Sequence, residues 1–294
     1  MNCNLPKITY STFRLLLLLK IHEAISPKGD VEVAKRSLKA PIIAVDAEKS
    51  NRLPEKTILS RVKKSTSVAA YQSAIALQIA ALSDQNPTLI AGEIAEVCRR
   101  CSCEATLLDP NFVEASLRDL TVGVTEAGFI QFEFGDRALA AWLRSWLNDQ
   151  SLQQLTLERL TDSNPLNEDQ TFVCQYTYAR AKSLLQMAKS LRLEPSILGE
   201  VASTLLKPSE RSLLFAMVSI ADELIDATAQ TCANSAIALA QAFAAFDRDC
   251  RILAQQSITQ CHVAQRRLAL VMITQLLLRA LLEQKLNVFL PDSL

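Results

Sequence analysis

The chain has 294 residues, of which 49% are hydrophobic and 21% are charged, and this composition indicates a globular protein and argues against a disordered one. Only six glycines and ten prolines stand among many Ala, Leu, Ile and Gln residues, which favours helices over sheets. The densest apolar run, Leu15–Leu19, is shorter than the roughly 20 residues of a membrane span. Because no small-residue cleavage site follows it, we expect a cytoplasmic protein with reduced cysteines and no membrane partner.

Charge is distributed unevenly along the chain, although the chain is neutral overall. Residues 1–70 hold 13 Lys and Arg against 6 Asp and Glu, residues 71–170 hold 6 against 15, and residues 171–294 hold 12 against 10. We therefore expect a nucleic acid to meet the two ends and to avoid the acidic middle. The alternative is that each surface is simply solvated.

The first 66 residues are predicted to form a variable basic segment. A helix is expected over residues 8–25, ending at the Ser-Pro-Lys-Gly-Asp turn that begins at Ser26. Residues 28–66 are polar and weakly patterned, and Pro41–Val45 is the single short strand that we predict there.

Residues 67–147 are predicted to form a small α+β domain. Helical spacing of apolar residues predicts a helix from Ser67, and Asn86-Pro87 should open a second one, because Asn caps helices and Pro fits the first turn. Apolar and polar residues then alternate on both sides of a turn at Glu126–Gly128, which predicts a β-hairpin. A helix over residues 136–147 should cover this hairpin.

Residues 148–170 are rich in polar residues and are interpreted as a linker that lets the two halves fold separately. From Thr171 the pattern is helical to the end, with turns expected at residues 206–208 and 232–234. Residues 171–294 are therefore predicted to form a helical bundle, so that the fold class is mainly α. Its apolar stripes consist of Leu213, Met217, Ile220 and Leu224; Leu239, Phe243, Phe246 and Cys250; and Leu270, Ile273, Leu277 and Leu281.

Several segments of this bundle are similar to the DALR anticodon-binding domain of arginyl-tRNA synthetases. Gln175–Arg180 resembles the signature that opens the domain, and the later segments follow in the family's order. These later segments are Glu210–Leu214, Leu239–Phe246 with Cys250, Arg267–Val271 and the closing Pro291–Leu294. The resemblance implies a helical domain that binds tRNA.

The amino-terminal half resembles the same enzymes independently. Tyr71–Ser73, the helix after Asn86-Pro87 and Gly128–Phe132 resemble their amino-terminal domain, which contacts the outer corner of tRNA. In that family a nucleotide-binding catalytic domain lies between the two parts, and here only the linker stands in its place. His22 and His262 belong to no His-x-Gly-His motif, and no glycine-rich phosphate loop is present.

The resemblance thus implies a non-catalytic paralogue that binds tRNA or a tRNA-like RNA, needs no cofactor and neither activates arginine nor charges tRNA. Two alternatives stay open. The first is a protein-interaction scaffold that has lost RNA binding and docks on a synthetase or another protein, which the acidic middle would favour. The second, which we expect less, is an accessory subunit in arginyl-tRNA aminoacylation, with the catalytic domain supplied by a separate chain. Nothing in the sequence points to DNA.

The opening signature supplies the first candidate RNA contacts. Tyr176, Tyr178 and Arg180 offer aromatic faces and a guanidinium plane to unstacked bases. For Tyr176 we favour the alternative of packing in the core, because it belongs to one helical stripe. The other residues of this stripe are Ala179, Ser183 and Met187. Lys182 and Lys189 lie seven residues apart on one helix face and could contact phosphates, or could simply be solvated.

Three further positions follow from the family comparison. Gln131 stands where the family commonly has Asn in reading the tRNA corner, and Leu294 stands where its tail near the anticodon loop usually has Met. Asp247 replaces a tyrosine after Phe246, and a carboxylate there would repel phosphate.

The cysteines form one cluster, with Cys98, Cys101 and Cys103 in a Cys-x-x-Cys-x-Cys arrangement. Zinc would need a fourth ligand, for which only the distant Cys261-His262 pair offers a source. We expect ordinary thiols and no metal site.

Overall fold

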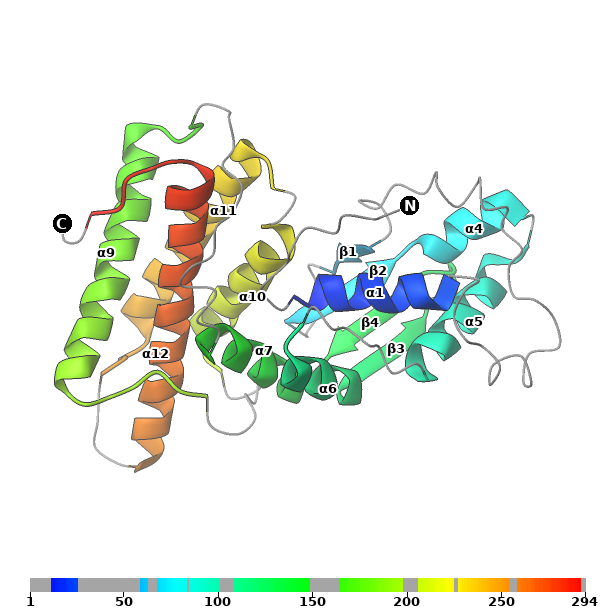
Figure 1. The fold of residues 1–294 in the computed structure, drawn as a ribbon, viewed down its shortest axis with the longest axis horizontal. Helices are drawn as coiled ribbons and strands as arrows, with labels where there is room; N and C mark the ends of the chain where they lie inside the picture. Colours follow the sequence, from blue (N-terminus) through cyan, green and yellow to red (C-terminus); the bar gives the residue numbers. More distant parts are fainter. Residues whose placement is uncertain are drawn as a thin grey trace.

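A computed structural model describes residues 12–25, 59–62, 68–83, 85–100, 108–148, 164–197, 206–224, 227–253 and 258–291. The fold is mainly helical, and a small sheet with its covering helices lies beside a helical bundle along the long axis (Figure 1). The expected fold class is confirmed. Within the described ranges, none of the helices is both long and apolar enough to cross a membrane.

The sheet is antiparallel with strand order β1-β2-β4-β3. The predicted hairpin is confirmed as β3 and β4, whose register pairs Val124 with Ile130. Its turn uses Gly128 at a φ of +82°, a conformation that glycine adopts without strain. The strands are β1 (Leu59–Arg61), β2 (Ala69–Ser73), β3 (Leu120–Val124) and β4 (Ile130–Phe134).

The helix predicted from Ser67 is wrong over its first residues. Residues 69–73 form β2, and helix α4 (Ile75–Ser83) begins only afterwards. Tyr71 pairs with Phe132 and is buried, and a strand covered on both faces lacks the alternation that identifies strands in a sequence. Strand β1 was not predicted, and the strand predicted at Pro41–Val45 lies outside the described residues.

The core of the α+β part is centred on Phe13 of α1 (Phe13–Ile25). Its ring lies 5.2 Å from that of Phe112, 4.5 Å from that of Phe134 and 6.2 Å from that of Trp142, measured between centroids. These partners bring α6 (Pro110–Arg118), β4 and α7 (Asp136–Asn148) together. Rings at such distances add favourable contacts to the burial of apolar area.

Helix α5 (Pro87–Arg100) begins where the sequence predicted. The Asn86 Oδ1 accepts a hydrogen bond of 2.9 Å from the Thr88 backbone N–H, so the expected cap is confirmed. Helix α6, which was not predicted, is capped likewise by Asp109, whose carboxylate accepts from the Phe112 N–H at 2.9 Å.

The bundle consists of α9, α10, α11 and α12, the last continuing into a π-helical turn. All residues of the three predicted apolar stripes are buried in it, which confirms the periodicity. The helices are α9 (Glu168–Ser190), α10 (Pro208–Glu223), α11 (Ala229–Asp249), α12 (Ile258–Arg279) and η2 (Ala280–Lys285).

Two boundaries of the bundle differ from the prediction. Helix α9 starts three residues before Thr171, because Asn167 and Gln170 form a reciprocal capping box. The turn expected at residues 232–234 is wrong, since α11 runs through it and the Thr228 hydroxyl caps that helix from outside.

The two parts meet at Asp222, a buried residue of α10. Tyr71 Oη donates to one carboxylate oxygen at 2.6 Å, and the Arg14 backbone N–H donates to the other at 3.2 Å. The Arg61 guanidinium lies 4.3 Å from the centroid of the Phe215 ring and donates to the Phe215 carbonyl at 3.1 Å. Each carboxylate oxygen of Asp222 therefore accepts a hydrogen bond from the amino-terminal half. These directional contacts favour one orientation of the sheet against the bundle.

Burial raises the pKa of Asp222 to about 6, although the positive charge of Arg61 acts in the opposite direction. Burial and the Asp222 charge also raise the pKa of Tyr71 well above its ordinary value. The junction thus contains a carboxylate that takes up a proton in the folded state at a pH where the unfolded chain would release it.

We predict that Asp222 makes the free energy of unfolding fall as pH rises from about 4 to about 6, because the folded chain binds the extra proton over that range. In Asp222→Asn this contribution is absent. The free energy of unfolding of the wild type, minus that of the variant, should therefore fall by about 2–3 kcal/mol between pH 4 and pH 7. Urea unfolding followed by circular dichroism measures both free energies. Glu223→Gln, which changes the exposed neighbour, is the control, and an equal pH dependence of the two differences would contradict the prediction.

Candidate nucleic-acid interface

The exposed face of α9 carries the candidate residues of the opening signature. Tyr176 was expected in the core, and this is wrong, because 55% of the residue is exposed. The expected stripe also contains Ser183 and Met187, which both face solvent. The helix instead buries a stripe of smaller side chains against the bundle, namely Cys174, Thr177, Ala181, Leu184 and Ala188.

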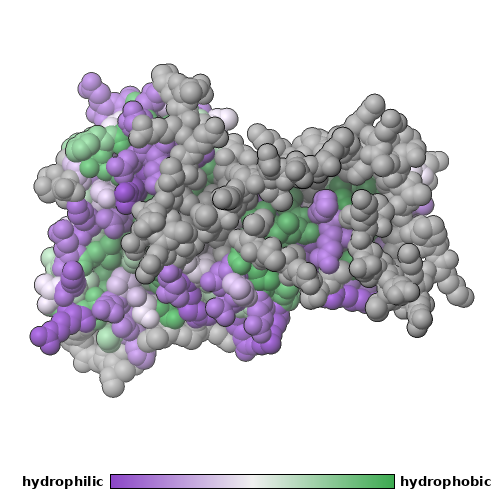
Figure 2. Space-filling view, in the orientation of Figure 1, coloured by the Kyte–Doolittle hydropathy of each residue, from purple (hydrophilic) through white to green (hydrophobic). Residues whose placement is uncertain are grey.

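Tyr176 belongs to an aromatic and apolar surface. Its ring stacks on that of Phe172, with 6.4 Å between centroids and 28° between planes. Phe289 is 77% exposed near the same helix, where its carbonyl accepts a 2.7 Å hydrogen bond from Gln175 Nε2. Figure 2 shows hydrophobic patches, in green, breaking the hydrophilic surface along the edge where α9 lies. Further exposed apolar residues of this surface are Val173, Met187 and Leu191.

A shallow pocket of about 260 Å³ opens between α9 and α11 beside Tyr176. Its lining combines two aromatic rings, two guanidinium groups, one carboxylate, one hydroxyl group and one alanine. Such a set can stack on a planar heterocycle and hydrogen-bond its edge. The lining residues are Tyr176, Thr177, Arg180, Phe243, Ala244, Asp247 and Arg248.

Arg180 and Asp247 form a two-point ion pair across this pocket. Arg180 Nε lies 2.8 Å from Asp247 Oδ2, and Nη2 lies 3.3 Å from Oδ1. The hydrogen bond to Asp247 raises the pKa of Arg180. Asp247 was expected to repel phosphate, and in the structure its charge instead compensates that of Arg180. The Arg180 side chain is 40% exposed, and with its charge compensated it offers a planar stacking surface more than a net charge.

The remaining candidates lie apart from the pocket or outside the described residues. Tyr178 is partly buried against the core, Lys182 is half-buried, and Lys189 is exposed in the last turn of α9. Gln131 is exposed on β4, which lies in the other half of the molecule from α9 (Figure 1). Leu294 lies outside the described residues.

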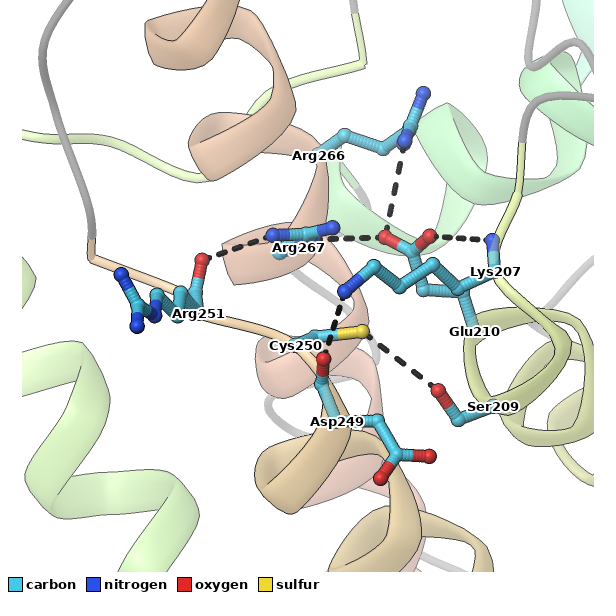
Figure 3. A network of polar contacts seen from close by, with 8 residues as sticks. All are labelled: Lys207, Ser209, Glu210, Asp249, Cys250, Arg251, Arg266 and Arg267. Atoms are coloured by element: carbon cyan, nitrogen blue, oxygen red, sulfur yellow. Dashed lines mark hydrogen bonds and ion pairs between the residues drawn. The ribbon is translucent and has the colours of Figure 1, made fainter.

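Beyond the pocket, a polar network surrounds the carboxyl end of α11 (Figure 3). Its centre is Glu210, which is 1% exposed and accepts from Arg267 Nε at 2.8 Å, with Arg266 Nη2 at 3.7 Å. The other carboxylate oxygen of Glu210 accepts from the Lys207 backbone N–H at 2.8 Å and caps α10. One buried anion therefore holds α10 and α12 together.

The last residue of α11 and the residues just after it contact the same network. Arg267 Nη1 donates to the Arg251 carbonyl at 2.8 Å, and Lys207 Nζ donates to the Asp249 carbonyl at 2.7 Å. Cys250 Sγ lies 3.7 Å from Ser209 Oγ. In Figure 3 the Arg251 side chain points away from Glu210.

The sequence did not single out this cluster as a site. Glu210, Cys250 and Arg267 each lie in a segment quoted above for its resemblance, and the structure brings them together although up to 57 residues separate them. Their contacts are made within the bundle, so these residues stabilise the fold. The exposed cations beside them, Lys207, Arg248 and Arg251, had no sequence pattern to mark them.

The cysteine cluster lies mostly outside the described residues. Cys98 is buried in α5, whereas Cys101 and Cys103 lie outside the described residues. Across the described residues, no three His, Cys, Asp or Glu side chains are grouped so as to hold a metal ion.

Comparison with known families identifies the bundle. Residues 174–287 match the model of the DALR anticodon binding domain. No curated protein and no solved structure matches the chain. The match begins within α9 and ends just after η2, so it covers the pocket and the Glu210 network.

We predict that Glu210→Gln destabilises the fold by about 3 kcal/mol or more, because it leaves Arg267, whose side chain is only 12% exposed, without a countercharge. Asp247→Asn is the matched comparison. It breaks a half-exposed pair and should cost at most about 1 kcal/mol. Urea unfolding of both variants measures these costs, and equal losses would show that the Glu210 network is no more important to stability than the surface pair.

Proposed function

We propose that this chain binds tRNA, or an RNA that resembles it, through its DALR domain, as a non-catalytic paralogue of arginyl-tRNA synthetase. DALR domains bind the tRNA anticodon in synthetases, and residues 174–287 match that family. The observation that carries the proposal is the exposed Tyr176 ring at the mouth of a pocket between Arg180 and Arg248.

This geometry suits an unstacked base. Sequence-specific RNA recognition favours loops, whose bases can stack on aromatic rings and guanidinium planes. Phe172 supports the Tyr176 ring from one side, so the ring is held in place for stacking without a large loss of freedom on binding. The Arg180–Asp247 pair adds donors and acceptors at the pocket edge.

The other candidate residues enter the proposal as secondary contacts. Lys182 and Lys189 follow Arg180 along α9 and are suited to phosphates, and Tyr178 would act mainly by supporting the helix. Gln131 on the far half of the molecule would meet a different part of a tRNA-sized ligand, and Leu294 belongs to the tail that the resemblance places near the anticodon loop.

A protein-interaction role is the second candidate. Val173, Met187 and Leu191 extend the apolar surface of α9 beyond what one stacked base would cover, and exposed apolar surfaces are frequently covered by partners. An accessory role beside a separate catalytic chain is a special case of this candidate, in which that partner would be a synthetase.

We predict that Tyr176→Ala weakens binding of total tRNA by about 1–3 kcal/mol, because each base–aromatic stack contributes about that much. Tyr176→Phe keeps the ring and should bind nearly as well as wild type. Leu89→Ala, which removes an exposed apolar side chain of α5, is the control for general surface effects. Filter binding or fluorescence anisotropy at low salt gives the affinities.

Two results would decide against the proposal. If the wild type binds no tRNA even at low salt, the RNA role is lost and the protein-interaction role takes its place. If Tyr176→Ala and Leu89→Ala weaken binding equally, the RNA does not use the pocket, and the DALR surface must bind it elsewhere.

A further inference from the structure

A positively charged strip continues from the Tyr176 pocket around the carboxyl end of α11. Arg248 lines the pocket and belongs to the last turn of that helix, and Arg251 follows just beyond it. Lys207 reaches the same place from the start of α10, where its Nζ lies 2.7 Å from the Asp249 carbonyl oxygen (Figure 3). We call Lys207, Arg248 and Arg251 the α11 rim. All three residues are exposed.

Among the described residues around the rim, the positive charges outnumber the carboxylates that can compensate them. Glu210 is buried and forms ion pairs with Arg266 and Arg267, so its charge is compensated by these two residues and not by the rim. Asp249 faces Arg248 at 3.3 Å, but the side chains are 75% and 45% exposed, and such a pair is weak in water. An anion approaching the rim therefore meets an excess of cations.

The pocket itself differs from the rim in this respect. Arg180 is compensated by Asp247 through two hydrogen bonds, which leaves the pocket with aromatic and hydrogen-bonding character. Exposed guanidinium and ammonium groups, by contrast, contact phosphates without reading sequence. The pocket thus suits the bases of a nucleotide chain, and the rim suits its phosphates.

We infer that the α11 rim is a phosphate-binding track for single-stranded RNA, which places a base against Tyr176 and the adjoining phosphates on Lys207, Arg248 and Arg251. This inference rests on the proposed RNA-binding function and adds to it a second group of contacts and the path of the strand. The buried Glu210 network fixes the track, because it ties Lys207 and the Arg251 backbone to α10 and α12.

The test is the salt dependence of binding of a short fluorescein-labelled oligouridylate to the full chain. Each phosphate contact to a single strand contributes about 0.7 to the slope of log affinity against log salt. The variant Lys207→Gln, Arg248→Gln, Arg251→Gln should therefore lose about 2 from that slope and bind on the order of tenfold more weakly at low salt.

Two further variants separate charge from structure. The charge-keeping variant Lys207→Arg, Arg248→Lys, Arg251→Lys should retain the wild-type slope and affinity within about twofold, since the electrostatic contribution depends on charge. The control variant Arg100→Gln, Arg118→Gln, Arg137→Gln removes the same charge from exposed positions on α5, α6 and α7. It should leave the slope unchanged.

The outcomes distinguish the inference from the function on which it rests. Binding of oligouridylate with equal slopes for the rim and control variants overturns the track and leaves RNA binding intact. Absence of binding by the wild type overturns both. Displacement of bound oligouridylate by polyglutamate at equal charge concentration, with the same loss in the rim variant, would assign the rim to acidic protein segments and also overturn the inference.

Discussion

The buried carboxylate of Glu210 is the interaction on which the shape of the proposed RNA-binding end depends. A carboxylate out of water is costly unless it is paired, and here two arginines of α12 and a backbone N–H of α10 share it. Lys207 and Arg267, which both contact Glu210, also donate to backbone carbonyls at the last residue of α11 and just after it. The backbone that bears the cations of the rim is therefore positioned by contacts within the protein.

Asp222 plays the corresponding part between the sheet and the bundle. Tyr71, Arg14 and Arg61 come from the amino-terminal half and all meet at α10, so the two parts are joined by directional polar contacts as well as by apolar packing. Directional contacts specify an orientation that apolar burial alone leaves loose. For a ligand as large as tRNA, a fixed orientation would set the distance between β4, which bears Gln131, and the α9 pocket.

Local patterns in the sequence predicted much of the fold, including the hairpin, the Asn86 cap and the three buried stripes of the bundle. These patterns gave wrong predictions where tertiary packing, and not the local sequence, determines the secondary structure or the burial of a residue. Val68 and Tyr71 lie at helical spacing with Ile75, yet residues 69–73 form a strand. Tyr176 shares a helical stripe with the buried Ala179, yet it is exposed. The rim could not be predicted, because Lys207 is brought to Arg248 and Arg251 only by the folding of α10 against α11.

The most direct measurement of the central claim is ultraviolet cross-linking of bound tRNA to the full chain, with the cross-linked peptides mapped by mass spectrometry. The proposed interface predicts cross-links in the α9 peptide that contains Tyr176 and in the peptide around Arg248 at the end of α11. Cross-links confined to the amino-terminal half of the chain, with none on α9 or α11, would contradict it.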